Sequence, residues 1–191
     1  TMKDGFIRVA AATPDIHVAD PQYNSEQIIE LMEQGSTRGV KVMAFPELCL
    51  TAYTCSDLFL QESLLREAKK ELKRILQASK SKDMILFVGM PWMHKGKLYN
   101  VAAVLNRGRI LGIVPKKHLP NYSEFYELRH FNPGMEKVEM TDWEGVQVPM
   151  GMNLLFACRT MPELVLAAEL CEDVWVPCPP SISHALAGAT V

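Results

Sequence analysis

Three apolar runs of strand length, separated by helical patterns, constrain the fold of this chain most. The runs cover Phe6 to Ala12, Val40 to Phe45 and Met84 to Val88. After the first run, Asp20 and Pro21 have the pattern of a helix N-cap followed by proline at the first helical position. After the second run, residues 62–79 place leucine, isoleucine and alanine on one helical stripe, with lysine and glutamate between them. This alternation predicts an α/β fold.

The strands that follow indicate a mixed sheet. Residues 98–105 and 109–114 are apolar runs joined by Asn106-Arg107-Gly108, a turn that is typical of a β-hairpin. A long loop rich in polar and aromatic residues extends from Lys117 to Gly134, and short strands are predicted at 146–148 and within 153–156. We find no internal repeat and no linker, so residues 1–191 are predicted to form one domain.

A further apolar run, Leu164 to Leu170, ends abruptly at Cys171. It is predicted to be a buried strand, and the helix expected next, at residues 179–187, begins with prolines. A thiol at such a strand end can lie in a crevice beside backbone N–H groups, although most buried cysteines only pack in a core. Residues 189–191 are predicted to begin a strand without a partner, so we expect the domain to be incomplete.

Composition and charge narrow the class of protein. The sequence has 48% hydrophobic residues and a formal net charge of -2, which does not favour binding to nucleic acid or to an anionic membrane. Its apolar runs are too short to span a bilayer. The five cysteines include no Cys-x-x-Cys pair and the histidines lack metal-ligand spacing, so we expect a cytoplasmic protein without a bound metal.

Three potential catalytic groups follow predicted strands. Glu47, Lys116 and Cys171 each come just after an apolar run, and side chains beyond the carboxyl ends of strands share the ligand crevice of an α/β sheet. A base, a cation and a thiol suit acyl transfer from an amide. Cys171 would attack the carbonyl, Glu47 would accept the thiol proton, and Lys116 with the N–H of Glu172 would stabilise the oxyanion. Taken singly, each residue has a plainer interpretation: a surface carboxylate, a solvated lysine pair with Lys117, and a core cysteine.

The residues around these three positions resemble the nitrilase, or carbon–nitrogen hydrolase, superfamily. The motifs that carry the resemblance are Phe45-Pro46-Glu47, Lys116-Lys117-His118-Leu119 and Glu169-Leu170-Cys171-Glu172-Asp173. The extended motifs are similar to one branch, the glutaminase domains of glutamine-dependent NAD synthetases. These extensions are Leu50-Thr51-Ala52-Tyr53, Pro120-Asn121-Tyr122-Ser123-Glu124-Phe125-Tyr126-Glu127 and Trp175-Val176-Pro177. Stand-alone nitrilase relatives usually have an arginine four residues after the cysteine, where this chain has Trp175.

The resemblance implies a role for each matching residue. Glu47, Lys116 and Cys171 match the catalytic triad of the superfamily. Glu127 matches a second glutamate that helps to hold the lysine and the substrate amide. The other expected substrate-binding residues are Tyr122, Glu172 and Trp175. Without the resemblance, the aromatic side chains would be interpreted as packing residues and Glu127 as a surface acid.

The resemblance also implies an architecture and partners. Its fold is an α-β-β-α sandwich with a mixed sheet, which here is expected to stop short at the C-terminus. It implies hydrolysis of glutamine without a cofactor, and transfer of the ammonia to a synthetase domain of the same polypeptide, absent from these 191 residues, that needs ATP and Mg²⁺. Members are expected to be homo-oligomers. Two alternatives stay open: a stand-alone amidase of the nitrilase family, and a non-catalytic α/β binding module.

Overall fold

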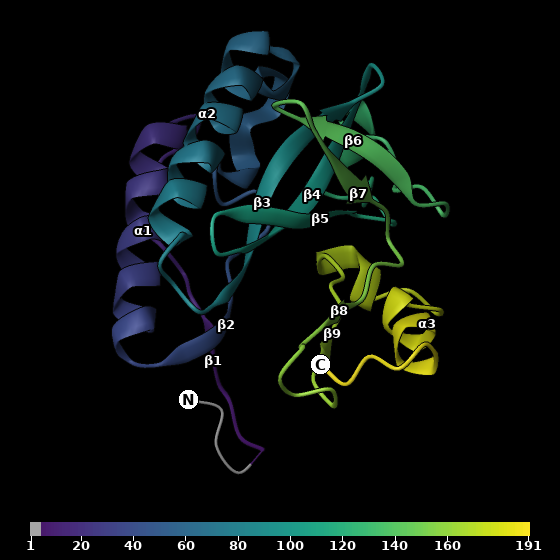
Figure 1. Cartoon of the computed structure of the whole chain (residues 1–191). Coiled ribbons are helices and arrows are strands. Elements are labelled where there is room, and N and C mark those ends of the chain that lie inside the picture. Colours follow the sequence, from purple (N-terminus) through teal and green to yellow (C-terminus); the bar gives the residue numbers. More distant parts are fainter. Residues whose placement is uncertain (1–4) are drawn as a thin grey trace.

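A seven-stranded mixed sheet forms the centre of the molecule (Figure 1). The structure is a computed structural model and describes residues 5–191. Strands β1 to β3 are parallel, β3, β4 and β5 form an antiparallel meander, and β7 pairs parallel with β5. In the order of the sheet, the strands are β1 (Arg8–Ala11), β2 (Val40–Ala44), β3 (Ile85–His94), β4 (Lys97–Asn106), β5 (Arg109–Pro115), β7 (Val146–Met150) and β6 (Glu139–Trp143).

Two long helices cover one face of this sheet, as Figure 1 shows. Helix α1 (Pro21–Thr37) begins where predicted, because the carboxylate of Asp20 accepts a hydrogen bond from the N–H of Tyr23. Helix α2 (Glu62–Ser79) buries the predicted stripe, whose members include Ala68, Leu72 and Ile75. These side chains form the main hydrophobic core with the strands beneath them. No helix within residues 5–191 has the length and apolar character that crossing a membrane requires.

The opposite face of the sheet carries the chain from β8 to the C-terminus (Figure 1). There lie a two-stranded sheet of β8 (Phe156–Ala157) and β9 (Val165–Leu166), the 3₁₀ helix η3 (Cys171–Val174) and the short helix α3 (Pro180–Leu186). Leu170 and Phe156 pack against sheet residues such as Val104. The main sheet therefore has two long helices on one face and the small sheet with its short helices on the other, which confirms the predicted α/β fold with a mixed sheet.

Two strand predictions are wrong in extent. The run at residues 164–170 forms a strand only at β9, in the small sheet, because the N–H of Leu170 is bound by the carboxylate of Asp173 and not by a ladder. Strand β3 continues past Val88 to His94 although it contains Pro91. Because the pairing of β3 with β2 ends at Phe87, the missing N–H of Pro91 costs no ladder hydrogen bond on that side.

Strand β6 lies where no strand is predicted, since only Thr141 and Trp143 of its five residues are buried and the apolar pattern is therefore faint.

The last residues of the chain are predicted to lack a strand partner, and this prediction is wrong. The N–H groups of Thr190 and Val191 donate to the carbonyl of Val165, and the N–H of Ala167 donates to the carbonyl of Val191.

Candidate active site

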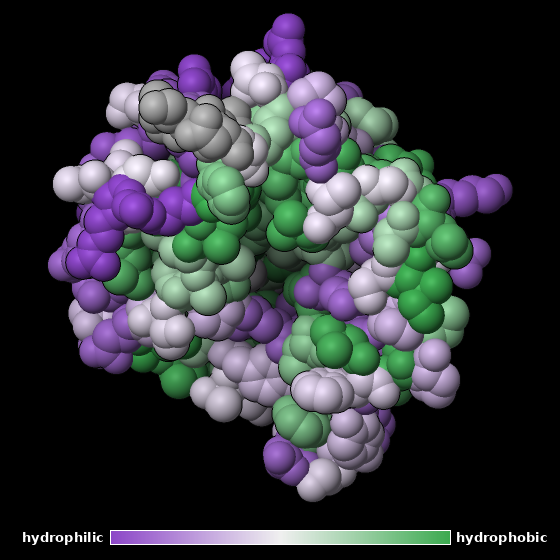
Figure 2. All heavy atoms as spheres, turned by 90° about the horizontal axis from the view of Figure 1, so that it is seen from below, coloured by the Kyte–Doolittle hydropathy of each residue, from purple (hydrophilic) through white to green (hydrophobic). Residues whose placement is uncertain are grey.

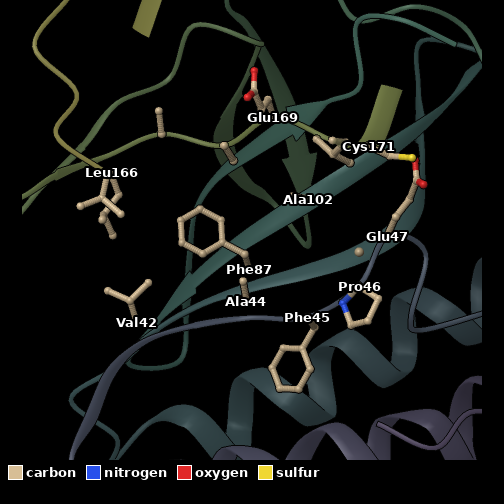
Figure 3. Close-up of a pocket in the computed structure, with 15 residues that line it drawn as sticks. Val42, Ala44, Phe45, Pro46, Glu47, Phe87, Ala102, Leu166, Glu169 and Cys171 are labelled. Atoms are coloured by element: carbon tan, nitrogen blue, oxygen red, sulfur yellow. The ribbon is translucent and has the colours of Figure 1, made fainter. Parts of the chain in front are cut away.

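Glu47 lies in the loop that follows β2. Strand β3 supports this loop at Gly89, where a Cβ atom would lie 2.4 Å from both the carbonyl oxygen of Pro46 and the N–H nitrogen of Leu48. Only glycine therefore allows the loop to lie directly on the sheet. Figure 3 shows that Phe45 points toward the helices whereas Glu47 points to the other side of the sheet.

Lys116 follows the last residue of β5 and is completely buried. Its Nζ lies 2.6 Å from Oε1 of Glu47 and 2.6 Å from Oε1 of Glu127. Burial opposes the charge of the ammonium group, but the two carboxylates outweigh it and raise the pKa of Lys116. The site thus holds a permanent cation between two acids.

Glu127 begins the 3₁₀ helix η2 (Glu127–Arg129) and is itself buried. Its Oε1 also accepts a hydrogen bond of 2.8 Å from the hydroxyl of Tyr53, the first residue of the 3₁₀ segment η1 (Tyr53–Leu60). The two segments are joined a second time, because Asp57 of η1 binds Arg129 through both carboxylate oxygens and contacts His130 at 2.9 Å. Burial is the main reason why the pKa of Glu127 is raised.

The backbone structure around Cys171 differs from the prediction. This residue does not end a strand of the main sheet but begins η3, with a backbone φ of 45°, a conformation that is uncommon for residues other than glycine. The buried carboxylate of Asp173 fixes this turn against the loop after Lys116. It accepts hydrogen bonds from the N–H groups of His118 at 2.7 Å, Lys117 at 3.3 Å and Leu170 at 3.2 Å.

The thiol of Cys171 and the carboxylate of Glu47 point toward one another (Figure 3). Partial burial raises the pKa of the Cys171 thiol, the negative charge of Glu47 raises it further, and the positive charge of Lys116 opposes both. The resting cysteine is therefore a neutral thiol beside a carboxylate. Such a pair needs proton transfer to Glu47 to produce the nucleophilic thiolate.

A cavity of about 410 Å³ lies between the main sheet and the segment from Leu166 to Cys171. Its walls are mostly apolar and include Val42, Phe87 and Leu166, and Figure 3 shows Cys171 and Glu47 together at one end of it. The view in Figure 2 shows a hollow with apolar residues around it. A polar substrate group that enters this cavity finds the thiol of Cys171 and the carboxylate of Glu47 at that end, and Glu169 also lines the wall.

The other residues predicted for substrate binding lie beside this centre. The hydroxyl of Tyr122 contacts both carboxylate oxygens of Glu172, at 3.1 and 2.9 Å, and both side chains are accessible. The side chain of Trp175 is 77% exposed and does not line the cavity, so its place in a substrate pocket stays a prediction. Within residues 5–191 there is no cluster of three His, Cys, Asp or Glu side chains suited to hold a metal ion.

Three side chains in the site were missed by the sequence reasoning. Asn100 of β4 donates to Glu47 at 2.6 Å, Tyr53 donates to Glu127, and Asp173 anchors the turn of Cys171. An available signal was the position of Asn100, a polar residue within the otherwise apolar run from Leu98 to Leu105 of β4. The other two lie within the motifs quoted for the resemblance, but nothing local indicates their contacts.

Base, cation and thiol thus meet in one partly enclosed site. A carboxylate beside a thiol can activate it, and an ammonium group held by two acids can stabilise a developing oxyanion without itself losing a proton. The arrangement is suited to acyl transfer through a thioester.

The chain is similar in sequence and in fold to several known enzymes. The chain is 41% identical over 187 residues to the glutamine-dependent NAD(+) synthetase of Mycobacterium tuberculosis, which covers 98% of this chain and 28% of the relative. It superposes on the crystal structure of a glutamine-dependent NAD(+) synthetase from Cytophaga hutchinsonii with a TM-score of 0.84 and 26% identity, over 96% of this chain and 29% of the other. An amidase from Nesterenkonia sp. shares the fold, with a TM-score of 0.68 and 21% identity over 96% of this chain and 62% of the amidase.

The chain therefore spans somewhat more than a quarter of the length of the curated synthetases that it matches. The family model for carbon–nitrogen hydrolases matches residues 8–191, which includes every residue of the site described above. The predicted resemblance is confirmed: the chain belongs to the carbon–nitrogen hydrolase family.

Proposed function

We propose that this chain is the glutaminase part of a glutamine-dependent NAD synthetase. The observation that carries the proposal is the meeting of Cys171, Glu47 and Lys116 in a chain that is similar, over nearly its whole length, to enzymes of that name. The reaction is hydrolysis of the side-chain amide of glutamine to glutamate and ammonia.

Each step follows from the positions of the side chains. Glu47 accepts the proton of the Cys171 thiol, and the thiolate attacks the amide carbon to give a tetrahedral intermediate. Lys116 and the N–H of Glu172 stabilise the oxyanion. The proton held by Glu47 passes to the amide nitrogen, ammonia leaves, and a thioester remains. Glu47 then takes a proton from water, the hydroxide attacks the thioester, and glutamate departs as the thiol is restored.

The remaining roles complete this proposal. Glu127 holds Lys116 between two carboxylates, an arrangement supported by the 2.6 Å contact. Tyr122, Glu172 and Trp175 contact the glutamine substrate. No cofactor takes part in the hydrolysis. The ammonia is used by a synthetase domain of the same polypeptide, which amidates deamido-NAD with ATP and Mg²⁺. We place this enzyme in the cytoplasm as a homo-oligomer, and the five free cysteines suit a reducing compartment.

The pKa of Cys171 offers a test of the base. In Glu47→Gln, turnover should fall by roughly 10² to 10⁴, because the group that accepts the thiol proton is lost. The thiol pKa should nevertheless decrease, since the charge of Glu47 raises it and the remaining charge of Lys116 lowers it. The rate of iodoacetamide alkylation of Cys171, measured against pH, reports this change. An unchanged or increased thiol pKa in Glu47→Gln would contradict the assigned pair.

The substrate class separates the proposal from its alternatives. We expect the full-length protein to release glutamate from glutamine far faster than it hydrolyses simple aliphatic amides, as measured by glutamate and ammonia formation. A preference for aliphatic amides would favour a stand-alone amidase. Neither hydrolysis nor labelling of Cys171 by the glutamine analogue diazo-oxo-norleucine would favour a binding module.

A further inference from the structure

Asn100 is a buried polar residue in a part of the sheet where its neighbours along the strand are apolar. It is the fourth residue of β4, between Tyr99 and Val101, and its side chain is completely buried. Burying an amide in an apolar layer is unfavourable unless its polar atoms find partners. The hydrogen-bond partners of this amide therefore indicate its role.

The amide donates to the acids of the site. Nδ2 of Asn100 lies 2.6 Å from Oε1 of Glu47 and 3.4 Å from Oε2 of Glu127. The opposite orientation would direct the amide oxygen at two carboxylates, so the surroundings fix which atom faces them. The backbone carbonyl of Asn100 also accepts the N–H of Lys116 at 2.9 Å, which ties the amide to the lysine.

The two donors to Glu47 share one of its oxygens. Nζ of Lys116 and Nδ2 of Asn100 both lie 2.6 Å from Oε1. Neither donor contacts Oε2 of Glu47, which is therefore the oxygen that these two contacts leave for the thiol proton. A second donor is useful here because Lys116 is shared with Glu127, so one positive charge serves two carboxylates.

The oxygen of the same amide is not paired as its nitrogen is. Within residues 5–191, Oδ1 of Asn100 is buried and has no hydrogen-bond partner. An unpaired buried acceptor is unfavourable for stability, and a catalytic role is one of the reasons for which such groups are retained.

We propose that Asn100 is a positioning residue of this active site, whose amide keeps the carboxylate of Glu47 turned toward Cys171. This role deepens the proposed function and rests on it. The titratable groups that face Glu47 are Lys116, Cys171 and Glu127, with Tyr53 behind Glu127. Removing the amide should leave Lys116 as the remaining donor to Oε1 of Glu47, so the carboxylate should be less firmly aligned with the thiol.

The test compares variants at two asparagines of the same strand. Asn100→Leu keeps a similar volume without a donor, and Asn100→Ser keeps one hydroxyl donor. The matched control is Asn106→Leu, because Asn106 also lies on β4 but donates to the carbonyl of Met84 away from the site. The readouts are kcat/KM for glutamine against pH and, separately, the pH profile of Cys171 alkylation by iodoacetamide.

In Asn100→Leu we expect the alkylation profile of Cys171 to move to lower pH, as in Glu47→Gln, because a displaced Glu47 carboxylate raises the pKa of the thiol less. Glutamine turnover at pH 7 should fall at least roughly tenfold, with little change in KM. Asn100→Ser should lie between this variant and the unaltered protein, and Asn106→Leu should shift neither profile. If Asn100→Leu does not fold, Asn100→Ser carries the test.

An alkylation profile at unchanged pH together with unchanged turnover in the folded Asn100 variants would overturn the proposal, as would equal changes in Asn106→Leu. The two readouts also separate the two proposals. If the unaltered protein does not hydrolyse glutamine, the proposed function fails. The alkylation profile would still show whether Asn100 controls the pair formed by Glu47 and Cys171.

Discussion

Replacing Cys171 by alanine in the full-length protein should abolish NAD synthesis from glutamine while synthesis from free ammonia continues. The thiol faces Glu47 and is the group that forms the thioester in the proposed reaction. Hydrolases that lose their nucleophile retain little activity, so glutamate release should fall by roughly 10⁴-fold or more. The measurement is glutamate release and NAD formation, with glutamine or ammonium chloride as the nitrogen source.

Cys178→Ala is the matched control, because Cys178 is also an exposed free cysteine but does not line the cavity. This variant should keep glutamine-dependent synthesis. Mass spectrometry after treatment with diazo-oxo-norleucine should place the label on Cys171, and not on the buried Cys49 or Cys55. Label found mainly on a cysteine other than Cys171, or near-normal glutamate release by Cys171→Ala, would refute the nucleophile.

Lys116→Met should have the second largest effect, on both catalysis and stability. Loss of the ammonium group removes a cation from the developing oxyanion, which costs roughly 3 kcal/mol or more of transition-state stabilisation. It also leaves the carboxylates of Glu47 and Glu127 near each other without their shared partner. Breaking a buried ion pair in this way lowers the free energy of unfolding by about 3 to 5 kcal/mol. Glutaminase kinetics and a urea titration measure the two losses.

The neighbouring Lys117 supplies the control, since its side chain has none of these contacts. Its backbone N–H binds Asp173, and a methionine at this position retains that group. Lys117→Met should therefore change turnover and stability far less. Comparable losses in the two variants would show that the wrong lysine of the pair has been assigned.

Local patterns in the sequence determined the helices and the hairpin of this protein. The apolar stripe of α2, the Asp20 cap of α1 and the turn between β4 and β5 are properties of neighbouring residues, which is why they could be predicted. Glu47 and Lys116 follow strands, so their positions at the crevice could also be predicted from the sequence. The family motifs singled out Glu127, which has no distinctive local pattern.

Only the tertiary structure decided how these groups are held. Cys171 is placed by the bonds of Asp173 to the backbone of residues 117 and 118, although the sequence suggested a strand end. Asn100 binds Glu47 across 53 residues, and Tyr53 binds Glu127 across 74. Periodicity reports which residues share a face of one element. Contacts between distant segments depend on the sheet register and on close approaches such as that at Gly89, which are set only when the whole core packs.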